Sequence, residues 1–159
     1  MPDKKIDPIR PTDDEARALA RSLIAEARYA ALAVTDPETG TPMVTRIALV
    51  PGSDGIPLSL ISTLSSHTHA LAASAACSLL IGEPGPKGDP LTHPRLTLQA
   101  ISERADKASL KEHYLSLYPK AQLYYDFGDF QLTRFTPMGG LLNGGFGKAF
   151  KLTPGDIVA

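Results

Sequence analysis

The amino-acid sequence predicts a mainly β domain with peripheral helices, an α+β fold in which short strands form a small antiparallel barrel. Apolar runs with strand-like alternation recur along the 159 residues, and turns rich in glycine, proline and aspartate separate them. Residues with helical spacing precede the first run and follow two later ones. The 43% apolar and 21% charged composition is typical of a globular domain that buries a core without disulfides or metals.

The N-terminal segment is expected to be a flexible arm over residues 1–11, followed by one domain over residues 12–159. Thr12 is predicted to cap the first helix, because Glu15 lies three residues further on, as in a capping box. Alanine, leucine and isoleucine then recur at helical spacing as far as Ala27. The arm has no apolar central region, so a signal peptide is not expected.

The remaining elements follow from alternation and turn composition. Strands are predicted over residues 29–35, 42–50, 57–62, 77–82, 94–105 and 129–136, with last strands over residues 139–143 and 147–152. Turns or loops are predicted over residues 36–40, 51–55 and 83–90. Helices are predicted over residues 66–75 and 106–118, with a further helical turn over residues 119–127.

Arg46 is the first candidate functional residue, because it lies inside the apolar strand pattern P-M-V-T-R-I-A-L-V of residues 42–50. Alternation places Val44 and Ala48 on the same face of that strand. An arginine among such neighbours needs an anionic partner or an open rim, and its planar guanidinium suits phosphate. An exposed arginine in a half-solvated sheet explains the pattern equally well.

A run of hydroxyl side chains leads from the third predicted strand into an alanine-rich helix. Within residues 62–68, these are Ser62, Thr63, Ser65, Ser66 and Thr68. The N-terminus of a helix carries free N–H groups and a partial positive charge, which attract anions. Helix capping alone would explain one or two of these hydroxyls, but not all of them.

Other polar motifs have simpler structural interpretations. His67 and His69 are two residues apart and would point in different directions on a helix, so no metal site is predicted. Asp126 and Asp129 are typical of turns and caps rather than of acid–base catalysis. The G-G-F-G-K motif of residues 144–148 lacks the spacing and the Lys-Ser/Thr ending of a phosphate-binding loop.

Charge and cysteine content narrow the functional classes. A formal net charge of −1 argues against a general nucleic-acid or membrane-surface binder. The single cysteine, Cys77, excludes an intrachain disulfide and fits a cytoplasmic protein. It begins an apolar run, so a buried rather than a reactive thiol is expected. No stretch approaches the roughly 20 apolar residues of a membrane span.

Five segments, taken in their order and spacing, resemble the pyridoxamine 5'-phosphate oxidase-like FMN-binding proteins, which fold as split β-barrels. They are P-M-V-T-R-I-A-L-V at 42–50, S-T-L-S-S-H-T-H-A-L at 62–71, D-P-L-T-H-P-R-L-T-L at 89–98, Y-Y-D-F-G-D-F at 124–130 and G-G-F-G-K-A at 144–149. The chain is most similar to the heme-utilisation (HugZ-type) branch. The resemblance spans nearly the whole chain and implies a split-barrel flavin-binding domain.

The resemblance also implies a homodimer with two FMN sites at the subunit interface. Arg46 matches the arginine that holds the FMN phosphate. The backbone stretch that lies along the isoalloxazine ring matches Ile47, Ala48 and Leu49. Further phosphate contacts match Ser62, Thr63, Ser66, His67 and Thr68. Lys148 would balance charge on the reduced ring. Because so small a barrel cannot enclose a flavin, a cleft between two subunits is expected on physical grounds as well.

The reaction is less clear than the cofactor. His67 and Thr68 stand where true pyridoxamine-phosphate oxidases carry basic residues, and the R-L-x-x-R-type substrate segment is absent, so that activity is not expected. The C-terminal histidine that usually binds heme in the HugZ-type branch has no counterpart after Gly144. We therefore expect an FMN-dependent oxidoreductase acting on an unknown small molecule. A non-catalytic flavin-binding module and a heme-binding or heme-degrading protein are the alternatives.

Overall fold

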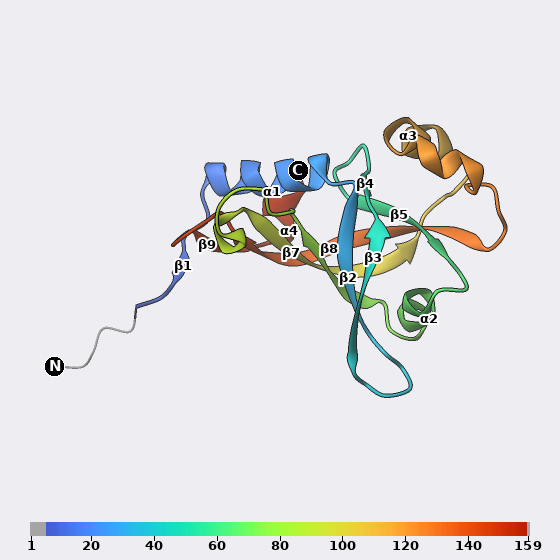
Figure 1. The fold of residues 1–159 in the computed structure, drawn as a ribbon, viewed down its shortest axis with the longest axis horizontal. Coiled ribbons are helices and arrows are strands. Elements are labelled where there is room, and N and C mark those ends of the chain that lie inside the picture. Colours follow the sequence, from blue (N-terminus) through green and yellow to red (C-terminus); the bar gives the residue numbers. More distant parts are fainter. Residues whose placement is uncertain (1–5, 159) are drawn as a thin grey trace.

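The computed structural model describes residues 6–158, in which nine strands form one open, mixed sheet with helices around it (Figure 1). The strands are β1 (Ile9–Arg10), β2 (Tyr29–Thr35), β3 (Pro42–Ala48), β4 (Val50–Pro51), β5 (Pro57–Ser62), β6 (Ala76–Ile81), β7 (Arg95–Arg104), β8 (Phe130–Asn143) and β9 (Ala149–Leu152). The helices are α1 (Asp14–Glu26), α2 (Ser66–Ala73), α3 (Lys111–Leu117) and α4 (Pro154–Ile157), with short 3-10 helices η1 (Pro90–Thr92) and η2 (Pro119–Leu123). The mainly β fold with peripheral helices is therefore confirmed.

The long strand β8 organises the sheet, whose order is β1-β9-β8-β7-β6-β2-β3. The first residues of β8 pair with β5, its last residues pair with β9, and β7 lies along most of its length. Among the strands of residues 6–158, only β1 and β9 pair in parallel. Within the described residues no ladder joins β3 to β5, so the barrel is split between these two strands.

Two buried clusters form the core. The larger one packs α1 against the sheet and includes Ala20, Leu32, Leu79, Leu98 and Phe135. The smaller one packs α3 and η2 against β5 and β8, and its centre is Tyr114, whose hydroxyl accepts a hydrogen bond from the Leu60 N–H at 3.2 Å. In the part of the chain that the structure describes, no helix has the length and apolar character to cross a bilayer.

The first helix begins one residue later than the sequence predicts. Asp13, not Thr12, is the N-cap of α1, and its carboxylate accepts a hydrogen bond from the Ala16 N–H at 2.8 Å. The Thr12 hydroxyl instead donates to the Lys151 carbonyl at 3.1 Å. Thr12 is thus engaged by a neighbouring strand, a long-range contact that no local pattern reveals. Residues 1–5 of the predicted arm lie outside the described residues, and Ile9 pairs with Ala149.

Further elements differ from the predicted ones in where they begin, in their continuity or in their presence. α3 begins at Lys111 rather than at 106, because the Asp106 carboxylate accepts bonds from the Ala108 and Ser109 N–H groups and holds a turn. β8 continues through the predicted gap at 137–138, where Met138 is an extra residue that shifts the register of the ladder with β7 between Gln99 and Ala100. The sequence analysis missed α4, which a Thr153–Asp156 capping box starts.

Candidate functional site

The free edge of β3 forms one wall of the candidate site. The Leu49 N–H donates to the Arg28 carbonyl at 2.9 Å, so the odd-numbered residues of β3 direct their main-chain groups toward β2. By the same alternation, the N–H and C=O of Arg46 and Ala48 point away from β2. The Ser59 hydroxyl accordingly donates to the Ala48 carbonyl from β5. The predicted ring-binding stretch therefore offers main-chain groups from Arg46 and Ala48, whereas those of Ile47 and Leu49 face β2.

The side chains of β3 divide between the core and the outer face. Ile47 and Leu49 are buried and anchor the strand. Arg46 is exposed on the outer face, where its guanidinium carbon lies 5.6 Å from the centre of the Tyr29 ring. Local burial and the hydrogen-bonded Glu83 carboxylate raise the pKa of Tyr29. This stacking holds Arg46 beside the free edge of β3.

The hydroxyl run lies at the N-terminus of α2, on the other wall of the site. Two of its hydroxyls brace the turn: Ser62 accepts from the Leu64 N–H at 3.1 Å, and Thr68 donates to the Ser62 carbonyl. Ser65 is the N-cap residue, yet within the described structure its hydroxyl makes no capping bond. Capping therefore does not account for Ser65, and the start of α2 keeps N–H groups available for an anion.

His67 connects the two walls. Its Nδ1 is hydrogen-bonded to the Thr45 hydroxyl of β3 at 3.0 Å. Burial lowers the pKa of His67, so the ring is neutral at pH 7 and adds no full positive charge to the site. The side chain can still offer its other ring nitrogen to a ligand. Thr45, which the sequence analysis did not select, thus fixes the orientation of a predicted site residue.

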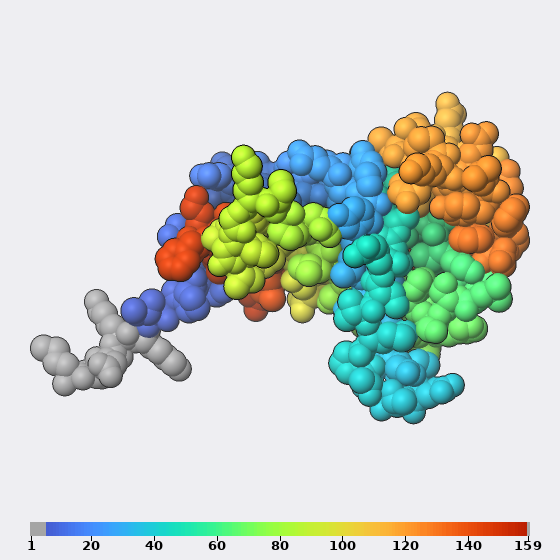
Figure 2. Space-filling model, in the orientation of Figure 1, coloured from blue at the N-terminus to red at the C-terminus, as the bar shows by residue number. Residues whose placement is uncertain are grey.

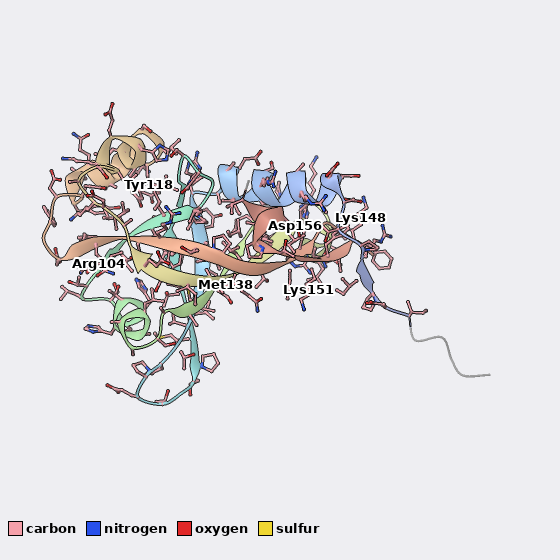
Figure 3. All side chains as sticks on the ribbon, turned by 180° about the vertical axis from the view of Figure 1, so that it is seen from behind. Arg104, Tyr118, Met138, Lys148, Lys151 and Asp156 are labelled. Atoms are coloured by element: carbon pink, nitrogen blue, oxygen red, sulfur yellow. The ribbon has the colours of Figure 1, made fainter. Side chains whose placement is uncertain are left out.

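The structure brings most of the predicted site residues together, with one exception. The residues that lie at or beside the gap between β3 and α2 are Arg46, Ile47, Ala48, Leu49, Ser62, Thr63, Ser66, His67 and Thr68. Figure 2 shows the β2–β3 hairpin and α2 side by side on the surface. Lys148 lies in the turn between β8 and β9, at the end of the molecule opposite Arg104 (Figure 3). Arg104 lines a hollow together with Thr68, so Lys148 lies far from its own chain's α2.

Two more hollows lie in the described structure near this region. One of about 420 Å³ lies between the hairpin and α2, and Asp36, Met43, Ser66 and His69 help to line it. The other, of about 520 Å³, is shallow and lies on the outer face of the sheet. Cys77 lines the second hollow, and burial raises the pKa of its thiol to about 11, so it is protonated at neutral pH, as expected for an unreactive cysteine.

Solved structures of known proteins share this fold. No protein-family model matches the sequence. One solved chain is 46% identical over 94% of this chain, is covered completely and superposes with a TM-score of 0.87. A heme-binding protein from Mycobacterium smegmatis is 26% identical, with a TM-score of 0.81, and the match covers 94% of this chain and 61% of that protein.

A third structure connects the fold to a named family. It is a protein of the pyridoxinephosphate oxidase family from Clostridium acetobutylicum, 18% identical, with a TM-score of 0.67 over 92% of this chain and 99% of the other. The chain therefore has the pyridoxamine 5'-phosphate oxidase-like split-barrel fold. The predicted split-barrel fold and the resemblance noted in the sequence are therefore confirmed.

A relative found by sequence similarity has a named activity. The chloroplastic heme oxygenase HOZ from Arabidopsis thaliana is 36% identical over 104 residues. That match covers 62% of this chain and 30% of the plant protein, so the chain spans less than a third of that relative's length. The comparisons thus join this split barrel to proteins described as heme-binding or heme-degrading.

Proposed function

We propose that the gap between the free edge of β3 and the N-terminus of α2 binds FMN, and that the protein is a flavin-dependent oxidoreductase acting on a small molecule. The observation that carries the proposal is the start of α2, where Ser65 leaves the helix N-terminus uncapped beside the strand that carries Arg46. Helix N–H groups, hydroxyls and one guanidinium form a donor set suited to a phosphate. When bound, FMN would supply hydride or electron transfer.

Different residues of the chain would contribute charge and hydrogen bonds to the phosphate. Arg46 supplies positive charge, while Thr63 and Ser66 supply donors at the start of α2. Neutral His67, held by Thr45, contributes a hydrogen bond rather than a charge. The phosphate thus has one fixed cation in this set, and we expect its affinity to depend strongly on Arg46 and on ionic strength.

The flat ring of the flavin would lie along β3. Outward main-chain groups of Arg46 can pair with the polar edge of the ring, while buried Ile47 and Leu49 keep the strand in place. The Ala48 carbonyl already accepts the Ser59 hydroxyl, so it contributes less to ligand binding. No side chain needs to act as a catalytic base, because the flavin carries the reactive atoms.

A second copy of the chain would complete the site. The strand registers place Arg46, Ala31, Leu80, Thr97 and Leu141 in one row across the outer face of the sheet. On four of these five strands, β2, β3, β6 and β8, the exposed apolar residues are Tyr29, Val44, Leu80, Met138 and Leu141. An apolar face of this kind is typical of a protein interface. In the proposed homodimer the second copy would border Arg46, and a lysine at this site would have to come from that copy, because Lys148 lies far from its own chain's α2.

Heme is the second candidate ligand, and the comparisons with the heme oxygenase and the heme-binding protein favour it. Its propionates are anions, so they can use the same donors at Arg46 and α2. Among the four histidines, His93 bonds Gly85 and Lys87 through its two nitrogens, and His113 bonds Pro51. His67 and His69 remain the histidines nearest the gap.

Separate titrations of the purified protein with FMN and with hemin test the proposal. We expect quenching of flavin fluorescence that saturates at one FMN per chain. Turnover of NADH or NADPH with an electron acceptor then distinguishes an enzyme from a non-catalytic flavin module. A stoichiometric Soret shift with hemin, without flavin quenching, would replace FMN with heme.

A further inference from the structure

Lys107 is a half-buried lysine that the proposed function does not use. It lies just after β7, and its ammonium donates to two main-chain carbonyls, that of Phe127 at 2.8 Å and that of Phe130 at 2.7 Å. These carbonyls belong to the two ends of one turn, in which the Phe130 N–H also donates to Phe127 at 3.1 Å. The Lys107 side chain is therefore hydrogen-bonded to both ends of the 127–130 turn and stabilises it.

The surroundings of Lys107 indicate a structural purpose for its charge. In the described part of the chain its ammonium forms no ion pair, and the nearest aromatic ring is that of Tyr125, with its centre 5.6 Å away. The Tyr125 hydroxyl donates to the Lys107 carbonyl at 2.6 Å, which fixes the backbone of the lysine as well. The cation is thus directed at carbonyl oxygens, where each hydrogen bond is charge-assisted.

The turn that Lys107 fastens supports the proposed phosphate site. The Asp129 carbonyl, inside the turn, accepts the Thr63 N–H at 2.7 Å. Next to it, Ser62 pairs with Phe130 in the β5–β8 ladder. Both residues begin the hydroxyl segment of residues 62–68 that leads into α2. The path from Lys107 to Thr63 therefore consists of one side chain, one turn and one main-chain hydrogen bond.

We propose that Lys107 is a positioning residue for FMN: it holds the 127–130 turn so that the turn orients Thr63 and the start of α2 toward the phosphate. This inference rests on the proposed function. Lys107 does not touch the ligand in this account, since its bonds go to the turn. Its removal would loosen the donors of the phosphate while leaving the flavin wall on β3 intact.

The test compares FMN with riboflavin, which lacks the phosphate, on the full-length protein. Lys107→Met keeps the length and apolar stem of the side chain but removes both charge-assisted hydrogen bonds. We expect Lys107→Met to bind FMN about tenfold more weakly and riboflavin with unchanged affinity. Lys107→Arg should restore most of the FMN affinity. Lys111→Met is the matched control, because Lys111 lies near the same tyrosine ring but pairs with the exposed Asp126 carboxylate.

Hydrogen exchange of the ligand-free protein gives a second readout. In Lys107→Met the amide of Thr63 should exchange faster than in the native chain, and in Lys111→Met at the native rate. If native protein binds FMN but Lys107→Met keeps the native ratio of FMN to riboflavin affinity, the inference is wrong and the FMN proposal stands. If native protein binds neither flavin, the proposed function is wrong and this inference with it.

Discussion

Single residues decide how charge is placed in the proposed FMN site. Arg46 brings a permanent positive charge and is held on Tyr29, whereas His67 is partly buried and hydrogen-bonded to Thr45. Burial lowers the pKa of His67 and keeps it neutral at pH 7, so it acts there as a hydrogen-bonding group. The site therefore relies on its guanidinium and on main-chain N–H groups rather than on a cluster of cations.

The depressed pKa of His67 predicts a pH dependence of stability. Above the unfolded-state pKa of histidine, about 6.5, the ring is neutral in both states and costs nothing. As the pH falls below that value, the unfolded chain binds this proton more readily than the folded one, and the free energy of unfolding decreases. His67→Gln should remove this component, so its stability should fall less than that of the native chain between pH 7.5 and pH 5.5. Urea unfolding at the two pH values measures the difference, and equal decreases would contradict the assignment.

At the scale of elements, sequence patterns predicted where strands begin and end better than they predicted contacts between distant residues. The bounds of β2 and β5 agree with the predicted ranges, because a turn with glycine and proline follows β2 and another precedes β5. The cap of α1 and the continuity of β8 depend on contacts with distant strands, which local periodicity does not contain. Thr45 and Tyr29 were missed as site residues for the same reason, since their importance comes from His67 and Arg46 across the fold.

The end of β6 offers a test at this scale. Gly82 has φ +108°, and a Cβ built there would lie 2.6 Å from the Pro94 carbonyl oxygen, which belongs to the backbone. Gly82→Ala should lower the free energy of unfolding by about 3 kcal/mol or more, from strain and overlap together. Gly88→Ala is the control, because Gly88 has φ +82° with nothing within 4 Å, and it should cost only about 1 kcal/mol. Similar losses in denaturant unfolding of the two variants would refute this reasoning.

At the scale of the whole molecule, the sequence predicted the fold and one concentrated site but not where each part of that site lies. Arg46 and the 62–68 hydroxyls lie on elements that border the split between β3 and β5. Lys148 lies at the end of the molecule opposite α2, because β8 runs away from α2 along its full length. The account therefore depends on a second copy that covers the outer face of the sheet.

A charge on that face tests the proposed homodimer. Leu80 is exposed in the row that contains Arg46, and Leu80→Glu would place two like charges against an apolar partner surface. We expect native protein to sediment as a dimer and Leu80→Glu as a monomer with much weaker FMN binding. Leu123→Glu changes an exposed leucine that is the last residue of η2, and it should leave the dimer intact. A native monomer, or a Leu80→Glu dimer, would exclude this interface.

The most direct measurement of the central claim is the affinity of native protein and of Arg46→Met for FMN and riboflavin by calorimetric titration. We predict one FMN per chain, tighter binding of FMN than of riboflavin, and about a tenfold loss for FMN alone in Arg46→Met, because a charge-assisted contact to phosphate is removed. Arg21→Met, on the exposed side of α1, should bind both flavins as the native chain does. If Arg46→Met binds FMN with native affinity, Arg46 does not hold the phosphate and the proposed site is wrong.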